Sequence, residues 1–187
     1  MDNSASPNIY NSIDEIIKEH NNNKIILDNE LIKITLMSDI QIHDVQCNVL
    51  YATLKSNFME TIKDFESING YTQEFLRALD NIYNAFSIAN NKLSIIYDVT
   101  KVTSLFPPTL LWNIGNFFSK KKKITNDILY CTCIITRSKS LNALFKTFLN
   151  IYDNVKPINL CDTINNSLHF INNEIIKYNT IMEDNLL

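Results

Sequence analysis

Residues 58–100 read FMETIKDFESINGYTQEFLRALDNIYNAFSIANNKLSIIYDVT, and this stretch decides the fold that the sequence predicts. Steps taken alternately by four and three residues from Phe58 reach mostly large apolar side chains, which include Ile62, Phe65, Leu76, Leu79, Tyr83, Phe86, Leu93 and Tyr97. Apolar side chains at this spacing form a stripe along one face of an α-helix. The pattern therefore predicts a long amphipathic helix between Leu36 and Thr103.

The dipeptide Asn69-Gly70 is the strongest helix-breaking signal in this stretch, because glycine tolerates the left-handed conformation at a helix end. The apolar stripe nevertheless keeps its phase across Gly70 to Leu76 and Leu79. Two antiparallel helices joined by a turn would have no reason to keep that phase. A glycine inside a helix costs only about 1 kcal/mol relative to alanine. We therefore predict a helix that continues through Gly70 with a kink, and a break there is the alternative.

Three later segments, residues 110–118, 138–152 and 162–182, have apolar residues at helical spacing. Residues 124–137 are apolar on nearly every side, which favours a helix at the centre of a bundle, with a β-strand as the alternative. The two glycines of the chain are too few for a β-sandwich or a dinucleotide-binding loop. The predicted fold is therefore all-α, a helical bundle of about five to seven helices around the long central helix. It forms a single domain at residues 9–187, after a disordered N-terminus at residues 1–8.

The charge and hydropathy of the chain indicate its compartment and the partners that it is not expected to bind. The formal net charge is −3, so no basic field favours nucleic acid as a partner. No apolar run reaches the roughly 18 residues of a membrane span, and the polar N-terminus does not resemble a secretory signal. We therefore expect an intracellular, cytoplasmic protein. Its cysteines should then be reduced, buried thiols; they are Cys47, Cys131, Cys133 and Cys161.

The sequence has no pattern typical of catalysis or of cofactor binding. Cys131 and Cys133 form a C-x-C pair, whereas structural zinc sites use pairs separated by at least two residues. No G-x-S-x-G or H-E-x-x-H motif is present, and these are the signatures of common hydrolases. Gly70 and Gly115 stand alone, so no phosphate-binding loop can form around them. We therefore predict no cofactor, no metal and no enzymatic activity.

The long apolar stripe is the first candidate for a functional surface. As a coiled-coil seam it would bind a partner helix, with Asn69 and Asn90 setting the register. The predicted contact residues are Leu76, Leu79, Tyr83, Phe86 and Leu93. The partner is another protein or a second copy of this chain. In the alternative, the stripe packs onto the C-terminal helices of the same chain.

The second candidate is the segment from Leu105 to Lys123, where aromatic residues precede four consecutive lysines. An amphipathic patch of this kind can dock on an anionic membrane, where each lysine contributes about 1 kcal/mol. The contact residues would be Trp112, Phe117, Phe118, Lys120, Lys121, Lys122 and Lys123. The lysines could also serve as a nuclear address or a phosphate contact. In the other alternative they form an exposed loop, with Trp112 and Phe117 in the core.

The run Leu111-Trp112-Asn113-Ile114-Gly115 is the place to compare the chain with viral Bcl-2-like proteins, which it resembles in length and composition. The core motif of that family is Asn-Trp-Gly-Arg, and here the order differs and the arginine is missing. The resemblance implies a host-modulating helical protein. Residues 45–102 are also similar to the helical cores of small subunits in tethering complexes. The function that we predict is a non-enzymatic protein–protein interaction module, a subunit or adaptor. A membrane-associated protein and a Bcl-2-like protein are the alternatives.

Overall fold

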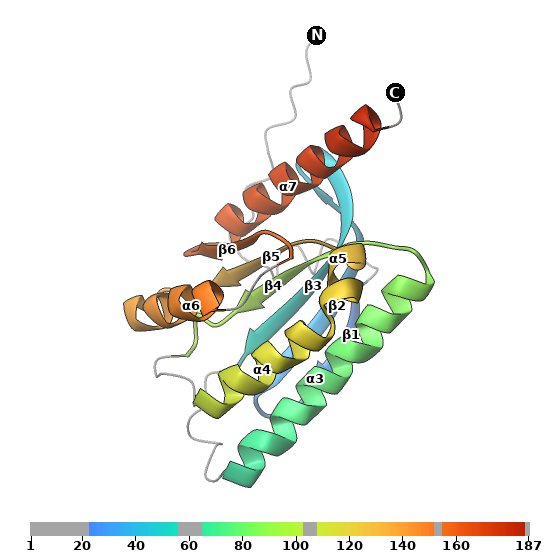
Figure 1. Ribbon diagram of the computed structural model, residues 1–187. Helices are drawn as coiled ribbons and strands as arrows, with labels where there is room; N and C mark the ends of the chain where they lie inside the picture. The colour runs from blue at the N-terminus through green and yellow to red at the C-terminus, as the bar shows by residue number, and fades with distance from the viewer. Residues whose placement is uncertain (1–22, 56–64, 103–107, 152–154, 186–187) are drawn as a thin grey trace.

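The computed structural model describes residues 23–55, 65–102, 108–151 and 155–185, and Figure 1 gives the labels of its helices and strands. Within these ranges the chain forms a six-stranded sheet with strand order β1-β2-β3-β4-β5-β6. The strands are β1 (Asn23–Asp28), β2 (Ile32–Ile42), β3 (Val45–Leu54), β4 (Leu93–Asp98), β5 (Leu129–Ile135) and β6 (Ile158–Cys161). The helices are α3 (Phe65–Ile88), α4 (Pro108–Lys120), α5 (Lys122–Ile128), α6 (Lys139–Ile151) and α7 (Ile164–Asp184).

The sheet is mixed. Strands β1, β2 and β3 form an antiparallel meander, and β3 to β6 are parallel to one another. Helix α3 connects β3 to β4, α4 and α5 connect β4 to β5, and α6 connects β5 to β6. Because the strand order advances in one direction and crossovers share one hand, these connections return over the same face of the sheet. Helix α7 follows β6 and covers the opposite face (Figure 1).

The core therefore has two layers, one on each face of the sheet. On one face α7 packs through Leu168, Ile171 and Ile175. On the other face α3 packs through a buried row that includes Leu79 and Tyr83, and α4, α5 and α6 extend this layer toward β6. The sheet is thus covered on both sides along its central strands.

The prediction of an all-α helical bundle with a coiled-coil seam was wrong, because the structure is an α/β fold around this sheet. The cause is the burial of the central strands on both faces, which removes the alternation of polar and apolar residues. In β4 the residues from Leu93 to Ile96 are all buried, and in β5 six of seven residues are buried. A short apolar run of this kind cannot be told from a buried helix by its periodicity. The resemblances to Bcl-2-like proteins and to helical tethering subunits both imply an all-helical protein, so the mixed sheet contradicts them as well.

Helix α3 is the part of the predicted long helix that the structure retains. It continues through Gly70 as predicted, but it spans only residues from Phe65 to Ile88. Asn90 ends it with a left-handed φ of 51°. The amide of Asn91 donates to the Phe86 carbonyl over 3.0 Å, and the amide of Asn90 donates to the Ser87 carbonyl over 3.2 Å. This pair of hydrogen bonds is a Schellman motif, so Asn90 terminates a helix and does not set a coiled-coil register.

The region between Ser38 and Leu54 was predicted to be helical and instead forms most of the β2–β3 hairpin. The two strands meet at His43 and Asp44, with Ile42 paired to Val45. His43 has a φ of 48°, a left-handed conformation that histidine, asparagine and aspartate adopt more often than other residues with a side chain. Because the turn residues are His43 and Asp44, the hairpin lacks the Asn-Gly or Asp-Gly dipeptide by which a sequence usually predicts such a turn.

Three predicted helices are confirmed, because α4, α6 and α7 coincide with the segments that had helical spacing. Thr163 caps α7, and its hydroxyl accepts a hydrogen bond from the Asn166 amide over 3.2 Å. The predicted disordered segment at residues 1–8 lies outside the described residues. The four cysteines are free and buried, as predicted. None of the helices described here has the length and apolar character that a membrane span requires.

Candidate ligand-binding cavity

A cavity of about 370 Å³ lies between the sheet and the helices α3, α4 and α6. Phe75 of α3, Ile114 of α4 and Phe145 of α6 form its outer walls. Tyr97 of β4 and Ile134 of β5 form its floor on the sheet. Most of the other lining side chains are also apolar. Its volume falls in the range of about 300–1,000 Å³ that is typical of small-molecule sites.

Two hydroxyl groups in the lining have no visible partner. The Oη atom of Tyr97 and the Oγ1 atom of Thr125 are buried, and neither makes a hydrogen bond to any residue that the structure describes. A buried polar atom without a partner costs about 1–3 kcal/mol. Such atoms therefore mark the places where a bound molecule could supply the missing partner.

The Tyr97 phenol is a neutral group at physiological pH. Burial raises its pKa well above the usual value of 10.0, because the ionised form would lose its hydration. The phenol can therefore donate one hydrogen bond and accept others from a ligand. The ring of Phe75 meets the ring of Tyr97 edge-on, with centroids 6.2 Å apart, and this contact fixes the side chain between α3 and the sheet.

The cavity reaches the surface between α4 and α5. Ser119 and Lys122 both line it and are both exposed, so they form its rim. Gly115 lines the cavity one turn earlier on α4 and is buried. Because glycine has no side chain, we expect a larger residue at this position to extend into the cavity.

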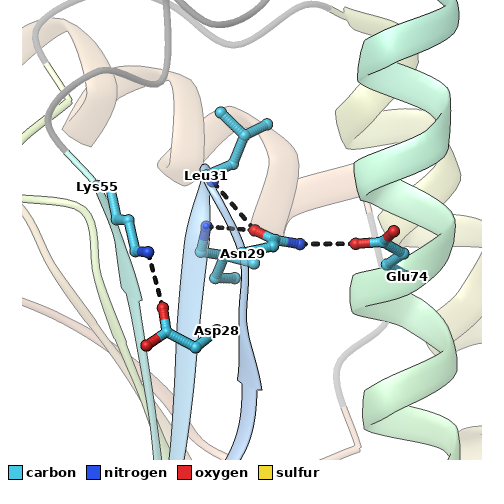
Figure 2. Close-up of polar contacts among 6 residues, drawn as sticks. Asp28, Asn29, Leu31, Lys55 and Glu74 are labelled. Carbon is cyan, nitrogen blue, oxygen red and sulfur yellow. Dashed lines mark hydrogen bonds and ion pairs between the residues drawn. The ribbon is translucent and has the colours of Figure 1, made fainter.

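The turn between β1 and β2 fixes one wall of the cavity to α3 (Figure 2). The Asn29 side-chain carbonyl accepts hydrogen bonds from the amides of Leu31 (3.0 Å) and Ile32 (2.9 Å), and both of these residues line the cavity. The Asn29 side-chain amide donates to a Glu74 carboxylate oxygen on α3 over 2.8 Å. One side chain therefore fixes both the turn and its distance from α3.

An ion pair connects two strands at the same end of the sheet. Lys55, which follows β3, forms an ion pair of 2.7 Å with Asp28 at the end of β1 (Figure 2). The hydrogen bond from Lys55 lowers the pKa of the Asp28 carboxyl below its ordinary value. The ion pair joins two strands that flank β2, and it lies close to the Asn29 turn. Together with the contacts of Asn29, the ion pair connects β1 and its turn to β3 and α3 on this side of the cavity.

The predicted partner-binding residues lie mostly inside the protein. Leu76, Leu79, Tyr83 and Leu93 are buried in the layer between α3 and the sheet, and Phe86 is half-buried at its margin. A partner helix could reach the first four only by displacing the sheet. Their role in partner binding stays a prediction that would require this displacement.

The predicted membrane-contact residues differ in their exposure. Trp112 is 64% exposed on α4, whereas Phe117 and Phe118 pack against the core beside α3. Lys121 forms an ion pair with Asp80 of α3. The side chains of the other three predicted lysines are exposed; they are Lys120, Lys122 and Lys123.

Sequence reasoning missed the two hydroxyl groups of the cavity. The spacing of apolar residues places Tyr97 on a helical stripe, and it gives Thr125 no functional role. Whether a buried hydroxyl lacks a partner depends on distant segments, so no local pattern could have identified them. In the described ranges no three histidine, cysteine, aspartate or glutamate side chains gather in a way that could hold a metal ion. Comparisons of the chain with known protein families, with curated proteins and with solved structures gave no match.

Proposed function

We propose that the protein binds a small, largely apolar molecule in the cavity between α3, α4, α6 and the sheet. The observation that carries the proposal is the pair of buried hydroxyls without a described partner, Tyr97 and Thr125, in a lining that is mostly apolar. A pocket with apolar walls and a few polar groups is the usual form of a small-molecule site. The ligand should be an apolar ring or chain with a hydroxyl, carbonyl or similar group.

The proposal requires no chemical reaction. Apolar contacts supply most of the affinity, at about 25 cal/mol per Å² of apolar surface removed from water. The two hydroxyls supply selectivity, because a ligand without a polar group leaves them without partners. An aromatic alcohol should therefore bind more tightly than the corresponding hydrocarbon.

The test compares 1-naphthol with naphthalene as probes of the full chain. We expect saturable binding of both in calorimetry, with 1-naphthol tighter by about tenfold, the equivalent of one hydrogen bond. The Tyr97→Phe variant should reduce this difference. Its free energy of unfolding should stay equal or rise, because an unpaired buried hydroxyl is removed.

The two glycines of the chain provide a matched pair of variants. In Gly115→Leu a side chain fills the cavity, and in Gly70→Leu it enters open space, since nothing lies within 4 Å of a Cβ at Gly70. Both changes remove a helical glycine and should gain up to about 1 kcal/mol of helix propensity. Gly115→Leu should lose probe binding and Gly70→Leu should keep it. No saturable binding by the folded wild type, or equal binding by the two variants, would overturn the proposal.

A further inference from the structure

A second cleft, of about 800 Å³, lies at the edge of the sheet where β4, β5 and β6 begin. Tyr178 and Met182, from the last turns of α7, form one wall. Its lining is mainly polar and includes several side-chain amides, such as those of Asn48 and Asn91. The cleft is therefore chemically unlike the apolar cavity, although Lys156 lines both.

Two lysines meet at one aromatic ring in this cleft. The Lys92 Nζ atom lies 4.7 Å from the centroid of the Tyr178 ring, and the Lys156 Nζ atom lies 5.8 Å from it. Tyr130 packs edge-on against Tyr178, with ring centroids 5.2 Å apart, and fixes the position of that ring. Attraction to the electron-rich ring face holds the two ammonium groups near each other despite their like charge.

Neither lysine is neutralised by a described carboxylate, since the structure shows no ion pair for Lys92 or Lys156 in the ranges that it describes. Lys92 Nζ donates a hydrogen bond of 2.5 Å to the Asp127 backbone carbonyl, which leaves further donors free. Both lysines are half-buried. Burial lowers the pKa of Lys156, and the charge of Lys92 lowers it further, while the nearby Asp127 opposes this shift.

We propose that this cleft binds a phosphate group carried by a small molecule, with Lys92 and Lys156 contacting the phosphate oxygens. A doubly charged oxyanion between two ammonium groups removes their repulsion and gives each a charge-assisted hydrogen bond. The cleft is much larger than a phosphate ion, so space remains for the group that carries the phosphate. Asp39 and Asp127 also line the cleft, and both are exposed, so their charges are better screened by solvent.

The test is a titration of the full chain with glycerol 3-phosphate, inorganic phosphate and sodium chloride at constant ionic strength. Amide NMR shifts should saturate with glycerol 3-phosphate at Asn91, Lys92 and Tyr130, and stay unchanged near Ile114 in the apolar cavity. Saturation with inorganic phosphate at equal affinity would support a free anion as the ligand of the same site. Sodium chloride should have no saturable effect.

Three variants that replace lysine by methionine complete the test. Lys92→Met and Lys156→Met should each weaken binding by about tenfold, which is typical for the loss of one charge-assisted hydrogen bond. Lys139→Met is the matched control, because Lys139 is an exposed lysine on α6 outside both cavities. Absence of saturable shifts in the wild type, or an equal loss in the control, would overturn the proposal. The wild-type shift map decides the question even if a variant does not fold.

Discussion

The Tyr51 hydroxyl on β3 donates a hydrogen bond of 2.6 Å to the Oδ2 atom of Asp98 at the end of β4. The other carboxylate oxygen of Asp98 accepts hydrogen bonds from the Thr100 amide, over 2.9 Å, and from the Thr100 hydroxyl, over 2.7 Å. Tyr51 is 6% exposed and Asp98 is half-buried, so this contact is partly sheltered from water. It joins two neighbouring parallel strands at the edge where their carboxyl ends meet.

Removal of the Tyr51 hydroxyl should therefore destabilise the protein. We expect Tyr51→Phe to lower the free energy of unfolding by about 1.5–3 kcal/mol, the usual effect of losing a hydrogen bond to a charged group. The matched control is Tyr71→Phe, which removes an exposed hydrogen bond of 3.3 Å to Glu30 and should change stability by less than about 0.5 kcal/mol. Urea denaturation measures both. Equal effects of the two variants would show that the Tyr51–Asp98 contact adds no stability.

Leu79 and Ile88 lie on the same helix, one buried and one exposed. Substitution by alanine should therefore change the stability of the protein by very different amounts at the two positions. Leu79 is 0% exposed between α3 and the sheet, whereas Ile88 is 88% exposed. Leu79→Ala should cost about 2–5 kcal/mol, because it leaves a cavity in the core. Ile88→Ala should stay within about 0.5 kcal/mol of the wild type. Equal effects of the two substitutions on thermal stability would show that the Leu79 side chain does not stabilise the core.

Sequence reasoning predicted those parts of the fold that depend on residues close together in the chain. Helices α4, α6 and α7 each have one apolar face and one polar face, so their spacing identified them. Thr163 caps α7 just after the predicted start at residue 162, and a capping residue acts within one turn of the chain. The continuation of α3 through Gly70 also followed from local spacing.

The strands were missed because burial on two faces depends on which helices cover the sheet. In β5 the alternate residues Cys131 and Cys133 face α7, and Thr132 and Ile134 face the layer of α4 and α6. All four are therefore buried, and the period of two residues disappears from the hydropathy pattern. The cavity was equally beyond prediction, since Tyr97 and Thr125 are brought together from a strand and a helix that are separate in the sequence.

Asn90 provides a test of how α3 ends. Its φ of 51° is costly for alanine by about 1–2 kcal/mol, and is accessible to glycine without that cost. Asn90→Ala should therefore lower the free energy of unfolding by about 1 kcal/mol, and Asn90→Gly should leave it nearly unchanged or raise it. Urea denaturation of the two variants measures the difference. If alanine were tolerated as well as glycine, the left-handed conformation at Asn90 would not be the feature that ends the helix.

The buried thiol of Cys47 should make the protein less stable in alkaline solution. Burial, with a smaller contribution from Cys131, raises the pKa of Cys47 from 9.0 to about 12 in the folded protein. The unfolded chain would lose this proton near pH 9, so between the two pKa values the unfolded state binds fewer protons. Stability is therefore fully present below about pH 9 and falls as the pH rises, by up to about 1.4 kcal/mol per pH unit for this one group.

The Cys47→Ala variant isolates this contribution. Its free energy of unfolding should be lower than that of the wild type at about pH 8, because a buried side chain has been shortened, and the gap should narrow toward about pH 11. Urea denaturation with a reducing agent, repeated across this range, measures the gap. Burial also raises the pKa values of Tyr83 and Tyr97, but both tyrosines are present in the two proteins, so their contribution cancels in the comparison. Two curves that stay parallel would mean that the folded protein does not hold Cys47 in its protonated form.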